Sequence, residues 1–278
     1  MTPVRSEGGQ RLYSDLDVER LRILHQLTAV GHSIGRLAGV PLEELQRLAR
    51  QEAPEGNALS AEPARSARAE SFKSAALQAA RRLDAGGLQA VLERAAVTLG
   101  VPEFVDQVAG PAIQEIGEEW SEGRMTAGHE HLATAVFHRV LGWIVETYDV
   151  DDATDRIIVA TPPHQVHELG ALLAGATAAA EGWQVTYLGA DLPVADIVGS
   201  ARQVGARVVA LSAVYPADDP CLLDDLEQIR TALPADVALI VGGAAAAPLR
   251  DRLAAAGVIP LDTLPELRAT LRRLAEKD

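Results

Sequence analysis

Three short motifs in the second half of the chain constrain its fold more than any other feature. The first runs from Gln165 to Gly170 and contains His167, and it is followed by Ser212-Ala213-Val214 and then by Gly242-Gly243. Each motif comes after a short apolar run with the composition of a buried strand. Their order and spacing predict that all three belong to one sheet.

The region 151–278 alternates strand-like and helical stretches. We expect strands at 156–160, 184–189, 208–213, 238–243 and 258–261, with helices such as 169–182 and 194–205 between them. Strands that are apolar throughout are covered on both faces, as in parallel sheets. The pattern predicts a flavodoxin-like, doubly wound parallel sheet, whose ligands lie at the carboxyl ends of the strands. The three motifs would therefore face one crevice.

The residue types in these motifs suit a corrinoid cofactor. A neutral imidazole is a good cobalt ligand, and a loop after the first strand can hold His167 below a corrin ring. Small residues at Ser212, Gly242 and Gly243 would let a detached nucleotide tail pass between the strand ends, where Ser212 can hydrogen-bond it. Taken singly, they also suit a loop histidine, a core hydroxyl and a turn. Their joint spacing favours cobalamin.

The preceding region, 72–150, is predicted to form a four-helix bundle. Helices are expected at about 72–84, 86–99, 101–121 and 126–148, with glycine and proline between them. The second of these carries apolar residues at helical spacing, which indicates a buried stripe: Leu88, Val91, Leu92 and Ala95.

Trp120 ends the third of these helices, and Glu130 and His131 lie near the start of the fourth. In a bundle next to a cofactor domain, these three side chains can converge over one cavity. The alternative is a core tryptophan and a solvated Glu-His pair, which are common in helical proteins.

The pattern from Gln165 to Gly243, which includes Gly170 and Val214, resembles the cobalamin domain of methionine synthase, corrinoid proteins and mutases, in which a histidine replaces the cofactor's own base. The pattern of Trp120, Glu130 and His131 resembles the CarH-type light-sensing regulators. This resemblance implies adenosylcobalamin whose cobalt–carbon bond is broken by light. It further implies that Trp120 covers the adenosyl group, that Glu130 hydrogen-bonds it with His131 as a neighbour, and that His167 is the lower cobalt ligand.

Two positions depart from the family patterns. Gln165 stands where the cobalamin motif has an aspartate or glutamate, so a neutral amide would orient the imidazole, and the cobalt–His167 bond would be weaker. Ser121 stands where the photoreceptor family has the histidine that takes the upper cobalt position after photolysis. We expect His129 or His131 to reach the metal instead, or a different light state.

The N-terminal residues Gly8-Gly9-Gln10-Arg11-Leu12-Tyr13-Ser14 resemble the wing of a MerR-type DNA-binding domain. Helices are expected from Ser14 onward, at 33–38 and at 42–50. Only seven residues precede Gly8, so residues 1–52 are interpreted as a truncated MerR-like segment without its helix-turn-helix. Residues 53–71, rich in Ala, Pro, Glu, Ser and Arg, are predicted to be a flexible linker.

The composition bears on the class of protein. A formal net charge of −14 opposes phosphate binding, so we expect no direct contact with nucleic acid. No apolar run approaches a membrane span, and the single Cys221 allows no intramolecular disulfide; a cytoplasmic protein is expected. No nucleophile lies at a sensible spacing from a base, so an enzyme is not expected.

The predicted function is a light sensor that changes its conformation, its oligomeric state or its contact with an unknown protein partner; a homo-oligomer is expected. A related subfamily, the photocobilins, adds biliverdin, which is a second expectation. Two alternatives stay open, a corrinoid protein that serves a methyltransferase and a transcription regulator that binds DNA together with a partner.

Overall fold

A computed structural model describes residues 4–5, 11–12, 20, 23–24, 37, 39–52, 58–148 and 155–276. The chain divides into two compact units, Met1–Arg65 and Ser66–Asp278, and each is described by itself. The part of the chain that the structure describes holds no helix both long enough and apolar enough to cross a membrane.

In the first unit, strand β1 (Val4–Arg5) pairs antiparallel with β2 (Arg11–Leu12). Helix α3 (Leu42–Glu52) confirms the helix expected after Pro41. The buried Leu45 of α3 belongs to a small apolar cluster with Ile23, Leu24 and Leu37. The two helices expected earlier in this segment fall largely outside the described residues.

Helix α4 (Ala58–Arg81) corrects the prediction for the linker. Residues 58–71 are helical rather than flexible, whereas residues 53–57 lie outside the described residues. Alanine, glutamate and arginine are strong helix formers, so the composition taken for a linker also suits a helix. The first part of α4 has no apolar periodicity because its residues 64–68 are exposed. Ala69 is the first of the described side chains of α4 to be buried.

The bundle confirms the other expected helices. Its remaining elements are α5 (Ala85–Leu99), α6 (Val101–Phe104), a π-helical turn η1 (Val105–Ala109), α7 (Gly110–Ser121) and α8 (Ala127–Thr147). Asp84 caps α5 by accepting a hydrogen bond from the Gly87 backbone N–H. The π turn precedes Pro111, whose ring cannot fit the regular i−4 geometry of an α-helix.

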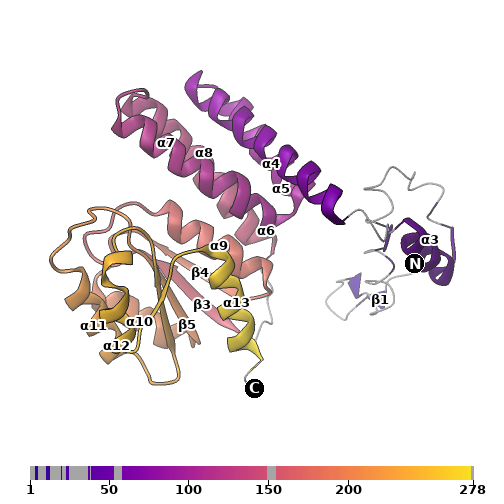
Figure 1. Cartoon of the computed structure of the whole chain (residues 1–278). Coiled ribbons are helices and arrows are strands. Elements are labelled where there is room, and N and C mark those ends of the chain that lie inside the picture. The colour runs from indigo at the N-terminus through magenta and orange to yellow at the C-terminus, as the bar shows by residue number, and fades with distance from the viewer. Residues whose placement is uncertain are drawn as a thin grey trace. The chain divides into compact units, whose positions relative to one another are not determined.

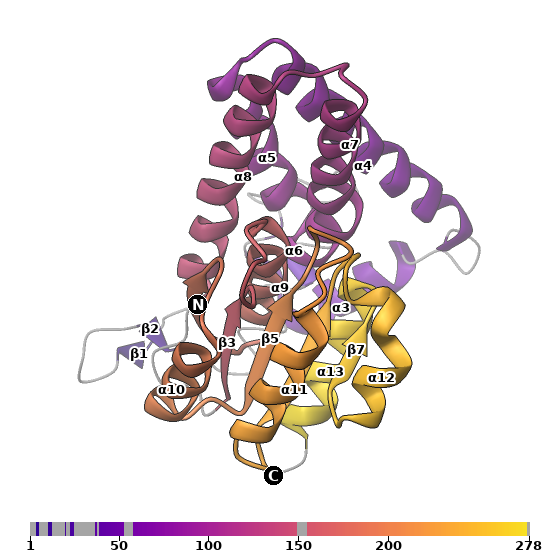
Figure 2. The same cartoon turned by 90° about the vertical axis from the view of Figure 1, so that its left-hand side faces the viewer.

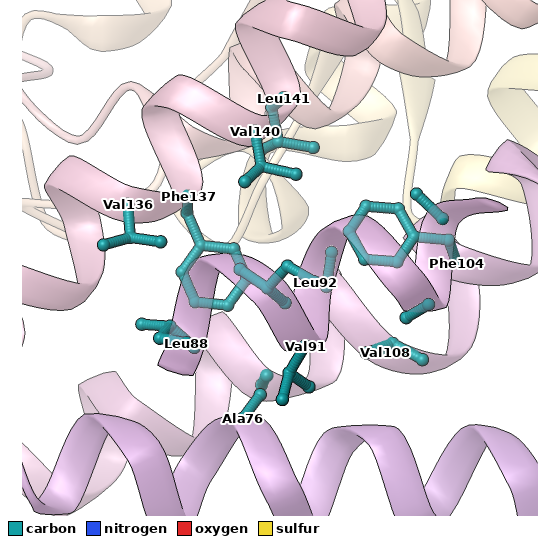
Figure 3. Close-up of a cluster of buried hydrophobic side chains, with 14 of the residues drawn as sticks. Ala76, Leu88, Val91, Leu92, Phe104, Val108, Val136, Phe137, Val140 and Leu141 are labelled. Atoms are coloured by element: carbon teal, nitrogen blue, oxygen red, sulfur yellow. The ribbon is translucent and has the colours of Figure 1, made fainter. Parts of the chain in front are cut away.

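Figure 3 shows the core of the bundle, in which Leu88 and Leu92 of α5 meet Phe104 of α6 and Phe137 and Leu141 of α8. Each of these five side chains is at most 1% exposed. Burial of such side chains contributes about 1.5–3 kcal/mol each. The same core includes Leu172, Leu173 and Ala176 of the next helix, α9, so the bundle packs directly against the α/β domain, residues 155–276.

The α/β domain contains a five-stranded parallel sheet in the order β4-β3-β5-β6-β7. Its strands are β3 (Arg156–Ala160), β4 (Gln184–Gly189), β5 (Val208–Ser212), β6 (Ala238–Gly242) and β7 (Ile259–Leu261). Counted along the sheet, this is the flavodoxin order 2-1-3-4-5, which confirms the predicted fold class.

Five helices cover the two faces of the sheet (Figure 1). They are α9 (Leu169–Ala180), α10 (Val194–Val204), α11 (Leu222–Ala232), α12 (Arg250–Ala255) and α13 (Leu264–Ala275). Helices α9 and α13 share one apolar cluster with the sheet, and α10, α11 and α12 share the other. Arg268 of α13 also binds Asp106 of η1, with Nη1 and Oδ2 3.1 Å apart, so an ion pair joins the bundle to the α/β domain.

Candidate cofactor-binding site

The three predicted motifs lie together at the carboxyl ends of adjacent strands. The loop with His167 follows β3, Ser212 ends β5 and Gly242 ends β6. The strand order reverses between β3 and β5, and the crevice at such a switch point is where ligands of doubly wound sheets bind. In Figure 2 the bundle lies at the same end of the sheet, the end toward which the β5 arrow points.

Gly170, Ser212 and Val214 form a close contact. A β-carbon added at Gly170 would lie 2.3 Å from Ser212 Oγ and 3.8 Å from Val214 Cγ2. Ser212 is 8% exposed, so its hydroxyl is held between the start of α9 and the end of β5. The absence of a side chain at 170 therefore brings helix and strand together.

The two glycines at the end of β6 allow the backbone of the neighbouring loop to approach. Gly243 has a φ of +106°, and an added β-carbon would lie 2.2 Å from the Ala213 carbonyl oxygen. The Ala213 N–H donates to Gly242 O at 2.9 Å, and Ala245 N–H donates to Ala213 O at 3.0 Å. A side chain at 243 would separate the loops that follow β5 and β6.

His167 is exposed, and its ring lies edge-on to Tyr215, with the centroids 5.5 Å apart and the planes at 79°. Within the described residues, its ring nitrogens make no hydrogen bond to protein. An exposed imidazole with a free ring nitrogen can bind a metal ion from outside the protein. No described group of three or more His, Cys, Asp or Glu side chains could hold a metal ion by itself.

Gln165 lies two residues before His167 and is buried, with 1% of its surface exposed. Its Nε2 donates to Pro216 O and to Asp219 Oδ2, both at 3.3 Å. Its Oε1 is buried without a hydrogen-bond partner in the protein. A buried amide oxygen requires a donor, so this atom is poised for a group that turns toward it.

The predicted bundle residues lie at the ends of α7 and α8. Trp120 is 45% exposed near the end of α7. In the first turn of α8, Glu130 Oε2 lies 2.7 Å from His131 Nδ1, and Glu130 Oε1 accepts from Thr134 Oγ1 at 2.8 Å. The described ring contacts do not include Trp120. Convergence of Trp120, Glu130 and His131 over one cavity thus stays a prediction.

The structure also describes the residues considered for the upper cobalt position. Ser121 Oγ donates to Glu118 O at 2.8 Å, which directs the hydroxyl back to its own helix. His129 Nδ1 pairs with Thr126 at the helix cap, 2.7 Å from Oγ1. The Nε2 atoms of His129 and His131 are the nitrogens left for a ligand.

Sequence reasoning missed a polar group directly beside the His167 loop. The Tyr187 hydroxyl on β4 donates to Glu168 Oε2, and His138 Nε2 on α8 lies 3.6 Å from Glu168 Oε1. Burial, and then the hydrogen bond to Glu168, raises the pKa of Tyr187 far above its ordinary value. Glu168 thus contacts both the sheet and the bundle. In the sequence, only the position of Glu168 next to His167 could have indicated that it belongs to the site.

Sequence reasoning also missed a charged pair formed by the residue before Trp120. This residue, Glu119, is 8% exposed and receives two hydrogen bonds from Arg81 of α4, Nη2 to Oε1 at 2.5 Å and Nε to Oε2 at 3.1 Å. The Arg81 guanidinium holds the pKa of Glu119 below its ordinary value. The end of α7 is therefore attached to the end of α4.

Comparison with known proteins assigns families to three parts of the chain. Residues 155–267 match a B12 binding domain model, residues 74–144 match a second B12 binding domain model, and residues 1–51 match the MerR HTH family regulatory protein model. The HTH-type transcriptional repressor CarH of Myxococcus xanthus is 28% identical over 246 residues, which cover 88% of this chain and 81% of the repressor. The chain is a CarH-type B12-binding protein.

Other relatives agree with this assignment. The repressor CarA of Myxococcus xanthus is 29% identical over 245 residues, 87% of the CarH-type chain and 76% of the repressor. Among solved structures, the monomethylamine corrinoid protein of Methanosarcina barkeri superposes with a TM-score of 0.58 at 14% identity, and the match covers 73% of this chain and 99% of that protein. That likeness supports the shared fold alone.

The described residues of this CarH-type chain fit a cobalamin. His167 offers an exposed ring nitrogen, and the buried Gln165 Oε1 lacks a donor. Both B12 models together span the bundle and the sheet, so the cofactor expectation is confirmed at the level of cobalamin.

The comparisons weigh against the expectation that nucleic acid is not a partner. Residues 1–51 match a MerR HTH model although the sequence interpretation placed the helix-turn-helix outside the chain. Both repressors are named as HTH-type.

Proposed function

We propose that this chain is a transcription regulator that binds adenosylcobalamin and responds to light. The observation that carries the proposal is His167, an exposed imidazole at the sheet's switch point, beside the close-packed Gly170 and Ser212. The kinship to two repressors and the MerR-like match at residues 1–51 support the regulatory part.

Each part of the site has a distinct task in this proposal. His167 would ligate the cobalt, and Ser212, Gly242 and Gly243 would receive the nucleotide tail of the cofactor. Trp120 and Glu130 cover and hydrogen-bond the adenosyl group. The bound cofactor supplies a light-sensitive cobalt–carbon bond, and that chemistry belongs to the cofactor rather than to the protein.

We infer that the packing of the bundle on α9 links cofactor binding to the regulatory response. Helix α8 and Leu172, Leu173 and Ala176 of α9 share one apolar core. A ligand that contacts both the bundle and the sheet stabilises one arrangement of the two. Loss of the adenosyl group would remove the contacts that favour this arrangement. The response we propose is a change in self-association, with DNA binding as the regulated activity.

The test compares the adenosylcobalamin-loaded protein in darkness and after green light. We expect a changed absorption spectrum together with a changed molar mass in light scattering. Unchanged mass and spectrum would reject the light-sensing proposal. Methylcobalamin serves as the comparison, because it lacks the adenosyl group that Trp120 and Glu130 would hold.

Two further results separate the alternatives. A corrinoid protein that serves a methyltransferase would bind cobalamin but keep the same mass in light and darkness. A gel shift with duplex DNA at low and high salt tests the DNA part, because non-specific phosphate contacts weaken steeply with salt. The comparisons give no support for biliverdin, the expected second chromophore.

A further inference from the structure

The side-chain amide of Gln165 has a defined orientation. Both partners of its Nε2, the Pro216 carbonyl and the Asp219 carboxylate, can only accept hydrogen bonds. The NH2 group must therefore face them, and Oε1 must face the other way. The backbone of Gln165 is held as well, since its carbonyl oxygen accepts from Thr161 Oγ1 and, at 3.2 Å, from Asp191 N–H.

This orientation leaves Oε1 as a buried acceptor without a donor, two residues before the cobalt ligand that the proposed function assigns. An imidazole that binds cobalt through Nε2 carries its proton on Nδ1 and requires an acceptor there. His167 now lies edge-on to Tyr215 and is exposed, so its ring has room to turn.

We propose that Gln165 relays the charge of Asp219 to His167. When the imidazole binds cobalt, its Nδ1–H donates to Gln165 Oε1, and Gln165 Nε2 donates to Asp219 Oδ2. The carboxylate that the cobalamin motif has two residues before its histidine is thereby provided from another loop, one hydrogen bond farther away. Gln165 and Asp219 are positioning residues for the His167 ligand, and this inference rests on the proposed function.

Asp219 is well placed for this task. Its Oδ1 accepts from Cys221 N–H at 2.9 Å, which fixes the carboxylate in the loop after β5, while Oδ2 faces Gln165. An amide polarised at its NH2 end by a carboxylate is a stronger acceptor at its oxygen, because hydrogen bonds in a chain reinforce one another. The imidazole then donates more electron density to the metal.

The experiment compares Asp219→Asn with Asp218→Asn in the full-length chain. The two substitutions change charge equally, and Asp218 is exposed and its side chain makes no hydrogen bond or ion pair with the described residues of the site. We expect Asp219→Asn to weaken hydroxocobalamin binding roughly tenfold, the scale of a lost outer-shell partner. The cob(II)alamin/cob(I)alamin midpoint potential should also become more positive, whereas Asp218→Asn should change neither property.

A double-mutant cycle tests whether the two side chains act in series. Gln165→Leu should lose at least as much affinity as Asp219→Asn, and combining the two should cost no more than Gln165→Leu alone. The exchange Gln165→Glu with Asp219→Asn keeps the total charge and should restore a negative shift in potential. Circular dichroism of the cofactor-free variants shows whether each of them folds.

The result that overturns the relay is equal affinity and potential for Asp219→Asn and Asp218→Asn, or additive losses in the double variant. His167→Ala separates this outcome from failure of the proposed function. If His167→Ala binds hydroxocobalamin as tightly as the unaltered chain, the ligand assignment itself is wrong. If it loses binding while Asp219→Asn does not change, the ligand stands and only the relay is rejected.

Discussion

Gly170 and Ser212 approach so closely that a β-carbon at position 170 would lie 2.3 Å from the serine Oγ. This contact joins the first turn of α9, which follows the His167 loop, to the end of β5. Alanine is the better helix former, so helix propensity does not explain a glycine at position 170. The close approach of Ser212, which leaves no room for a side chain, does explain it.

We therefore expect Gly170→Ala to displace Ser212, to lower stability by about 1–3 kcal/mol through overpacking, and to weaken cobalamin binding. Thermal unfolding and cobalamin titration measure both effects. Gly199→Ala is the matched control, because Gly199 is helical and exposed and a β-carbon there would meet nothing within 4 Å. It should be neutral or slightly stabilising, and a similar loss in both variants would contradict the steric argument.

The pair Arg81–Glu119 should make stability depend on pH. Its hydrogen bonds lower the pKa of Glu119 in the folded state below the ordinary value of 4.5. A lowered folded pKa contributes stability that is present above the unfolded pKa and is lost as the pH falls through the folded pKa. The contribution should therefore be full near neutrality and should decline below about pH 4.5.

Arg81→Met removes the donor and should cost about 1–3 kcal/mol at pH 7, with a smaller difference from the unaltered chain at pH 3. Urea unfolding across this pH range measures the effect. Arg82→Met is the control, since Arg82 is exposed and carries the same charge but its side chain makes no hydrogen bond or ion pair with the described residues. Equal losses at both pH values would mean that the effect comes from packing of the arginine stem.

Tyr187→Phe removes the hydroxyl that donates to Glu168, the residue next to His167. We expect a loss of about 1 kcal/mol, because a half-buried carboxylate loses one of its partners. A second expected result is weaker cobalamin binding, since Glu168 helps to fix the loop. Tyr148→Phe at the exposed end of α8 is the comparison. Cobalamin affinity that falls equally in both variants would exclude a specific role for the Tyr187 hydroxyl.

The sequence could predict most of the fold because its signals are local. Apolar runs such as 208–212 specify a strand buried on both faces, and the stripe of Leu88 and Leu92 specifies one face of a helix. The motifs at His167, Ser212 and Gly242 could be placed at strand ends for the same reason. The linker prediction failed because the exposed first half of α4 has no apolar stripe, although its helix propensity is high.

The amino-acid sequence by itself determined which residue types stand at the ends of β3, β5 and β6, and hence a crevice suited to cobalamin. Only the tertiary structure decided their partners. The bond from Gln165 to Asp219 joins residues 54 positions apart, and the bonds from Arg81 to Glu119 join residues 38 apart. No local periodicity encodes such pairs, because they exist only after packing brings distant loops and helices within hydrogen-bond distance.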